Sequence, residues 1–98
     1  MDMEALMAQA AELQTKVAAA QDLLSQTTVK GIADDATCII DMTAKYDMLG
    51  VFIRPDVLSL GAKAVSDAVL SAYRDAKQKA DVIIDRVMGD ATAGIPMP

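Results

Sequence analysis

The chain has 98 residues, the size of one small domain, and although 53% of them are hydrophobic only three are aromatic. Its net charge of −5 is opposite in sign to the basic surface that nucleic-acid-binding proteins usually present. The sequence has no histidine, which is the commonest general base and metal ligand, and its single cysteine, Cys38, excludes an internal disulfide. We therefore expect an aliphatic core, no enzymatic activity, no cofactor and no metal.

Nothing in the sequence predicts a membrane segment or a signal peptide. The first residues, Met1 to Glu4, are acidic where a signal peptide is basic, and no apolar run approaches the length of a membrane span. An unpaired cysteine fits a reducing compartment. We expect a cytoplasmic protein with no membrane partner, made of one domain over residues 1–90 and a flexible, uncharged tail over residues 91–98.

A long helix is predicted over residues 3–24. Its apolar residues recur at alternating spacings of three and four, which places them on one seam of a helix. They are Met3, Leu6, Ala10, Leu13, Val17, Ala20 and Leu24. The pattern suits packing against the chain's own domain and coiled-coil pairing equally well.

Three short strands are predicted to follow, at residues 27–33, 37–42 and 48–53. Turn-forming residues separate them at 34–36, where two aspartates occur, and at 44–47. Short consecutive strands joined by tight turns favour an antiparallel meander. Gly31, inside the first strand, indicates a bulge or the close approach of another backbone.

Alternation along the second and third strands predicts which side chains share a face of the sheet. Both faces of the third strand are apolar, so we expect one face to meet the helices and the other to meet the sheet of a second copy. The sequence leaves open which face forms the dimer. The residues expected at this interface are Cys38, Ile40, Met42, Leu49, Val51 and Ile53.

Pro55 ends the third strand, because proline fixes φ and donates no ladder hydrogen bond. A helical turn is expected directly after it, and a second long helix from about Gly61 to Gly89. Its apolar positions are Val65, Val69, Ala72, Ala76, Ala80, Ile83 and Val87. The order of helix, three strands and helix predicts an α+β subunit, with the meander flanked by two long helices.

The one locally basic stretch of the chain contains Arg74, Lys77 and Lys79. One interpretation is a helix face kept in solution by mixed charges, since acidic residues lie among these cations. The other is a surface that contacts DNA phosphates, to which Lys16 and Arg86 would add if they lie on the same side. The sequence has no recognition-helix pattern and few aromatic residues, so DNA binding of this kind would be independent of base sequence.

Several short segments occur in a characteristic order over nearly the whole chain. They are Leu6-Met7-Ala8-Gln9-Ala10, Val29-Lys30-Gly31, Gly50-Val51-Phe52-Ile53 before Pro55 and Leu58, Asp67-Ala68-Val69, Asp75-Ala76 and the ending Gly94-Ile95-Pro96-Met97-Pro98. Their order and spacing resemble the YbaB/EbfC family of bacterial nucleoid-associated proteins. Two departures are Arg54, where the family usually has an acid, and a first turn, residues 34–36, without the usual glycine.

The resemblance implies a subunit that dimerises through its sheets, with the helices projecting as two arms that bind double-stranded DNA. We therefore expect a homodimeric, sequence-tolerant DNA-binding protein of the bacterial nucleoid that helps to organise the chromosome. The family has no invariant base-reading residues to carry over, so the expected contacts rest on charge alone. The alternative is an acidic protein-interaction module that docks another protein through its apolar seams and has no direct contact with DNA.

Overall fold

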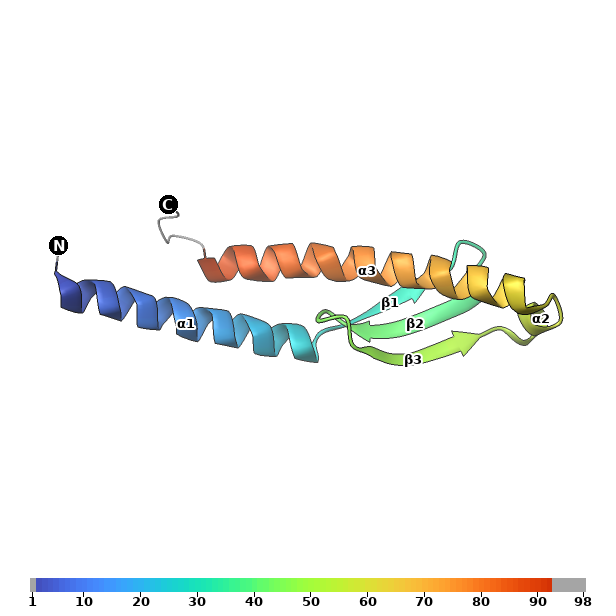
Figure 1. The fold of residues 1–98 in the computed structure, drawn as a ribbon, viewed down its shortest axis with the longest axis horizontal. Helices are drawn as coiled ribbons and strands as arrows, with labels where there is room; N and C mark the ends of the chain where they lie inside the picture. The colour runs from blue at the N-terminus through green and yellow to red at the C-terminus, as the bar shows by residue number, and fades with distance from the viewer. Residues whose placement is uncertain (1, 93–98) are drawn as a thin grey trace.

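The computed structural model describes residues 2–92, and these form two long helices and a small sheet (Figure 1). The elements in chain order are α1 (Met3–Gln26), β1 (Thr28–Ile32), β2 (Cys38–Thr43), β3 (Met48–Ile53), α2 (Pro55–Leu58) and α3 (Ala62–Thr92). The predicted α+β class is therefore confirmed. The molecule is elongated, with extents of 68 × 21 × 15 Å.

The three strands form one antiparallel sheet in the order β1-β2-β3, as the meander predicted. The bounds of β1 and β2 differ from the expected ones by one residue at each end. The turns between the strands each place a non-glycine residue in the left-handed region, Ala36 at φ 58° and Tyr46 at φ 70°. A register shift between Asp41 and Met42 marks a bulge in the pairing of β2 with β3.

The first part of α3 lies across one face of the sheet. Four alanines at helical spacing form its buried row, at positions 68, 72, 76 and 80. Small side chains let the helix approach β1 closely, and a Cβ placed on Gly31 would lie 2.1 Å from the carbonyl oxygen of Ala72. The close backbone approach predicted from Gly31 is thus confirmed.

The core corrects one of the expectations from the sequence. Cys38, Ile40 and Met42 were expected at the dimer interface, but all three are fully buried beneath α3 within this chain. A side chain with no exposed surface has none to offer to a second copy. Strand alternation correctly placed the three on one face, but it did not tell which face α3 covers.

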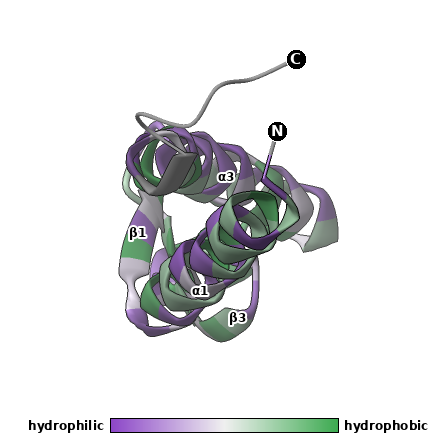
Figure 2. Cartoon of the chain, turned by 90° about the vertical axis from the view of Figure 1, so that its left-hand side faces the viewer, coloured by the Kyte–Doolittle hydropathy of each residue, from purple (hydrophilic) through white to green (hydrophobic). Residues whose placement is uncertain are grey.

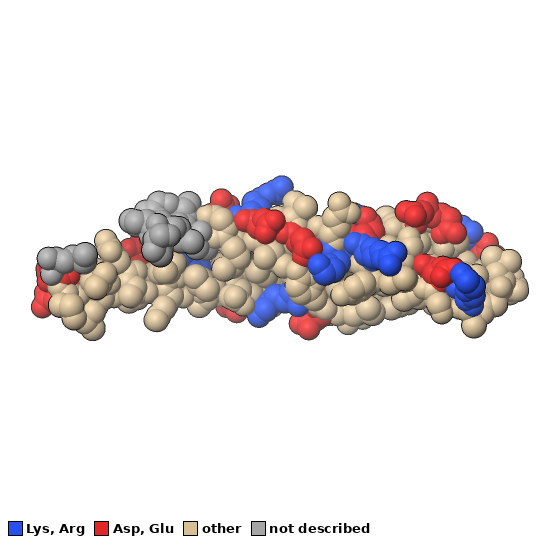
Figure 3. All heavy atoms as spheres, turned by 45° about the horizontal axis from the view of Figure 1, so that its top comes forward, with Lys and Arg blue, Asp and Glu red and all other residues tan. Residues whose placement is uncertain are grey.

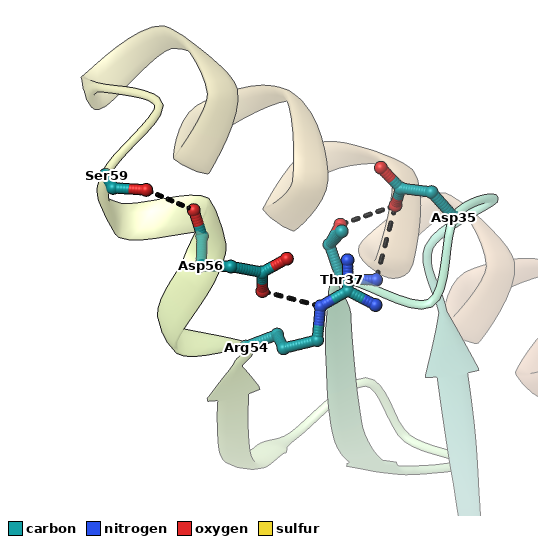
Figure 4. Close-up of polar contacts among 5 residues, drawn as sticks. All are labelled: Asp35, Thr37, Arg54, Asp56 and Ser59. Carbon is teal, nitrogen blue, oxygen red and sulfur yellow. Dashed lines mark hydrogen bonds and ion pairs between the residues drawn. The ribbon is translucent and has the colours of Figure 1, made fainter.

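The end of β3 is joined to α2 by a compact set of polar contacts (Figure 4). The N–H of Arg54 donates to the carbonyl of Thr37 (2.9 Å), and its side chain bonds the carboxylate of Asp56 (Nε to Oδ1, 2.6 Å). Ser59 donates to the carbonyl of Asp56 (2.7 Å) and so closes α2. Pro55 opens this helix at its first turn, where the missing N–H costs nothing.

Beyond the sheet, α1 and the distal half of α3 run side by side as a two-helix arm (Figures 1 and 2). Of the seam on α1, only Ala20 and Leu24 are buried, and Met3 and Leu6 near the tip stay exposed. The expected end of the second long helix at Gly89 is wrong, because α3 continues to Thr92. A helix tolerates an interior glycine at a cost of about 1 kcal/mol. Residues 93–98 of the expected tail lie outside the described residues.

Candidate nucleic-acid interface

Lys79 is held against the edge of the sheet. Its Nζ donates to the carbonyl of Lys30 in β1 (2.8 Å) and pairs with Asp75 one turn earlier on α3 (2.9 Å). Asp75 in turn accepts the N–H of Ile32 (2.8 Å). The bonds from Lys79 and from the Ile32 N–H lower the pKa of the Asp75 carboxyl. Lys79 therefore has a structural role on β1 besides any role in binding anions.

Lys77 points to a different part of the molecule. Its ammonium pairs with Asp81 (3.1 Å) and lies 5.7 Å from the ring centre of Tyr46, in the turn between β2 and β3. The Tyr46 hydroxyl donates to the Asp81 carboxylate, which lowers the pKa of Asp81 and raises that of Tyr46. The pKa of Lys77 is raised by the same carboxylate. This cluster joins the β2–β3 turn to α3.

The other predicted contact residues are exposed at separate places. Arg74 lies on the outer side of α3 and lines a groove together with Asp34, Asp67 and Asp75. Lys16 on α1 pairs with Glu12 (3.4 Å), as an exposed i,i+4 pair does on a helix surface. Neither Arg74 nor Arg86 has a salt bridge within the described part of the chain.

The structure does not gather the five predicted cations into one basic patch. Figure 3 shows positive and negative side chains alternating along the molecule, with uncharged surface between them. Lys45, which is not among the five predicted contact residues, is a further exposed lysine and lies next to Tyr46 in the β2–β3 turn. The chain therefore has scattered cations among acids and no single concentrated basic site among its described residues.

Neither a metal site nor a membrane span is found among the described residues. No three acidic, cysteine or histidine side chains lie close enough together there to hold an ion. No helix in that part of the chain is both long and apolar enough to cross a bilayer. The thiol of Cys38 is buried in the core, and this burial raises its pKa.

Comparison with known proteins identifies the family that this chain matches. Residues 1–95 match the YbaB/EbfC DNA-binding family. A nucleoid-associated protein of Bradyrhizobium diazoefficiens is 35% identical over 98 residues, which are 99% of this chain and 92% of the relative. One from Bordetella avium is 32% identical, over 95% and 86% of the two chains. An uncharacterised protein of Helicobacter pylori has the same fold, with a TM-score of 0.81 at 11% identity over 92% and 96% of the two chains.

Proposed function

Because this chain belongs to the YbaB/EbfC DNA-binding family, we propose that it binds double-stranded DNA as a homodimer in the bacterial nucleoid. The family match over residues 1–95 is the observation that carries the proposal. Relatives that align with 99% of the chain are named nucleoid-associated proteins. The function proposed is DNA binding, with chromosome organisation as its outcome and regulation of gene expression as a consequence.

The phosphate contacts proposed are Lys16, Arg74, Lys77, Lys79 and Arg86, all on α1 or α3. Arg74 and Arg86 are favoured among them, since they are exposed and lack a salt bridge within the described residues. Lys77 and Lys79 have to share their ammonium groups with Asp81 and Asp75. Contacts of this kind hold the sugar-phosphate backbone and carry no base sequence, so binding is expected to tolerate sequence changes.

A gel shift with duplex fragments of unrelated sequence tests the proposal. We expect binding at low salt that weakens steeply as salt rises, because each phosphate contact releases counterions. Because each subunit has a net charge of −5, the salt dependence of binding decides whether the protein contacts DNA phosphates. No shift at micromolar protein and low salt would falsify DNA binding.

The contact surface is tested separately with Arg74→Gln/Arg86→Gln, whose changes break none of the described salt bridges. We expect weaker binding and a shallower salt slope. Lys63→Gln is the matched control, since Lys63 is exposed at the other end of α3 and makes only an i,i+4 pair with Asp67. Equal affinity of the double variant and the wild type would place the contacts elsewhere on the chain.

The acidic surface supports a second candidate function, a protein-interaction module without direct DNA contact. Residues 2–26 carry Asp2, Glu4, Glu12 and Asp22 against the single cation Lys16, on a helix whose outer faces are exposed. Acids on a projecting helix repel phosphate and attract basic protein segments. Recovery of a stoichiometric protein partner after nuclease treatment, together with a negative gel shift, would favour this function over DNA binding.

A further inference from the structure

An apolar groove lies between the β1–β2 turn and the start of α3, at the end of the molecule away from the arm (Figure 1). It has a volume of about 400 Å³. Val57 of α2 and Ala68 of α3 are nearly fully buried and form its floor. The side chain of Leu60, which is 72% exposed, forms part of its rim. The groove therefore offers apolar surface on which a ligand can pack.

Three carboxylates line the same groove. Asp34 and Asp35 belong to the β1–β2 turn, and Asp67 belongs to α3 on the other side. None of the lysines and arginines in the described part of the chain lines it. No three acidic side chains among the described residues lie close enough together to hold one metal ion. The three carboxylates therefore suit a ligand with separate positive charges better than a single cation.

The turn that carries two of these acids is fixed in place. The N–H of Asp34 donates to the Ser71 hydroxyl on α3 (3.1 Å). The carboxylate of Asp35 accepts from the N–H and the hydroxyl of Thr37, and the hydroxyl bond lowers the pKa of this carboxyl (Figure 4). The carboxylate of Asp34 makes no salt bridge within the described residues. A rigid turn thus holds an unpaired negative charge beside the groove.

Three cations near the groove do not neutralise it. Lys63 pairs with Asp67 (2.8 Å), but this is an exposed i,i+4 pair of the kind that a ligand can displace at little cost. Arg54 pairs with Asp56 (2.6 Å). Arg74 lines the neighbouring groove along α3 and not this one. The apolar groove therefore keeps a negative rim.

From the apolar floor and the separated carboxylates we infer that this groove binds a short basic segment of a partner protein, with an apolar side chain between lysine or arginine residues. The apolar side chain packs on Val57 and Ala68. The basic side chains reach the rim, because their long stems carry the charge away from the apolar part. The exposed Leu60 favours a peptide over a small polyamine, which has no side chain to pack against it.

The size of the groove sets the length of the segment. It follows α3 from Ala64 to Ser71, which is about 10 Å at 1.5 Å per residue, the length of about three residues of extended chain. The inference goes beyond DNA binding and does not depend on it, since a rim of carboxylates repels phosphate. It predicts a second surface, at the opposite end of the molecule from the arm.

The inference is tested by fluorescence anisotropy, with a labelled synthetic peptide of alternating lysine and leucine titrated with the full chain in the absence of DNA. We expect binding at low salt. Asp34→Asn/Asp67→Asn should weaken it by about tenfold, because two charge-assisted contacts are lost. Asp22→Asn/Asp85→Asn is the matched control. It changes the net charge equally at two exposed acids of the arm that make no salt bridge within the described residues, and it should bind like the wild type.

Equal weakening in the two double variants would overturn the inference, because the peptide would then be attracted by the net charge of −5 and not by the groove. A wild-type chain that does not bind the peptide at low salt would overturn it as well. Since DNA is absent, a failed gel shift would leave the groove standing, and a failed peptide titration would leave a positive gel shift standing.

The apolar part of the groove is tested with a second pair of variants. Leu60→Ala should weaken peptide binding several-fold, whereas Leu23→Ala, at a leucine of α1 that is 52% exposed, should leave it unchanged. Both side chains are exposed, so neither change opens a cavity in the core. A peptide of alternating lysine and serine should bind more weakly than the leucine peptide. Equal binding of the serine peptide, or equal competition by spermidine, would overturn the inference in favour of a site for simple polycations.

Discussion

The two edge strands of the sheet, β1 and β3, are of similar length but differ in what surrounds them. On β1, the outward N–H of Ile32 and the outward carbonyl of Lys30 are both bonded, by Asp75 and Lys79 of α3. On β3, the outward groups of Val51 and Ile53 have no such bonds within the described chain. The helix thus closes one edge and leaves the other open. A small domain with one long helix over its sheet guards only the edge that the helix crosses.

The two glycines of the sheet, Gly31 on β1 and Gly50 on β3, differ in the same way. The largest effect on stability is expected from substituting the first of them. Gly31→Ala puts a methyl group against the backbone of α3, where the ideal Cβ lies 2.1 Å from an oxygen. We expect it to lower the free energy of unfolding by about 3 kcal/mol. Gly50→Ala on β3 meets nothing within 4 Å and should change it by less than about 1 kcal/mol. Urea unfolding followed by circular dichroism measures both, and equal losses would contradict the close helix contact.

Removing the side-chain contacts that cover the edge of β1 is expected to have a smaller effect on the free energy of unfolding. Asp75→Ala takes away the acceptor of the Ile32 N–H and the partner of Lys79. Because the site is partly exposed, water replaces some of these bonds, and the loss should be about 1 kcal/mol. Hydrogen exchange should show the Ile32 amide opening faster. Asp67→Ala, which breaks only the exposed pair with Lys63, is the control and should leave that amide unchanged.

The same carboxylate makes the β1 edge sensitive to acid. The pKa of Asp75 is lowered in the folded chain, so its contribution to stability is present above the ordinary aspartate pKa and is lost as the pH falls through the lowered value. Asp75→Asn cannot titrate. Between about pH 6 and pH 3, the variant should therefore lose less melting temperature than the wild type. Parallel decreases in the two proteins would mean that this carboxyl does not contribute.

The smallest effect is expected near the open edge, in the turn that leads into β3. Tyr46→Phe removes the hydroxyl that donates to Asp81 and keeps the ring beneath Lys77. Because the site is exposed, we expect only a small loss of stability, seen as a small decrease in melting temperature. Tyr46→Ala removes the ring as well and should cost more. If the two substitutions were equivalent, the ring would have no part in the contact with α3.

Much of the fold could be predicted from the sequence, because element type follows from local periodicity. The spacing of apolar residues identified both long helices, and Pro55 identified the end of β3. Local periodicity does not show which face of the sheet a helix from a distant part of the chain will cover. For this reason Ile40 and its two neighbours on the same face were assigned to an interface, although α3 covers them.

The candidate site was harder to predict for a geometric reason. Lys77 and Lys79 are two residues apart, which on a helix turns their side chains about 200° away from each other. One reaches the β2–β3 turn and the other reaches β1. Likewise, Asp75 and Lys79 have the spacing of an ordinary surface pair, and nothing local indicates that the pair closes a strand edge. Proximity along the chain was a poor guide to a shared surface.

The unbroken length of α3 has a mechanical consequence. Its 31 residues begin on the sheet and end in the arm, and the helix has no joint where it leaves the sheet. At 1.5 Å per residue it is a rod of about 46 Å. The buried alanine row packs one end of that helix against the sheet, so this packing fixes the direction of the arm. A force applied at the tip of the arm is therefore transmitted along α3 to the sheet.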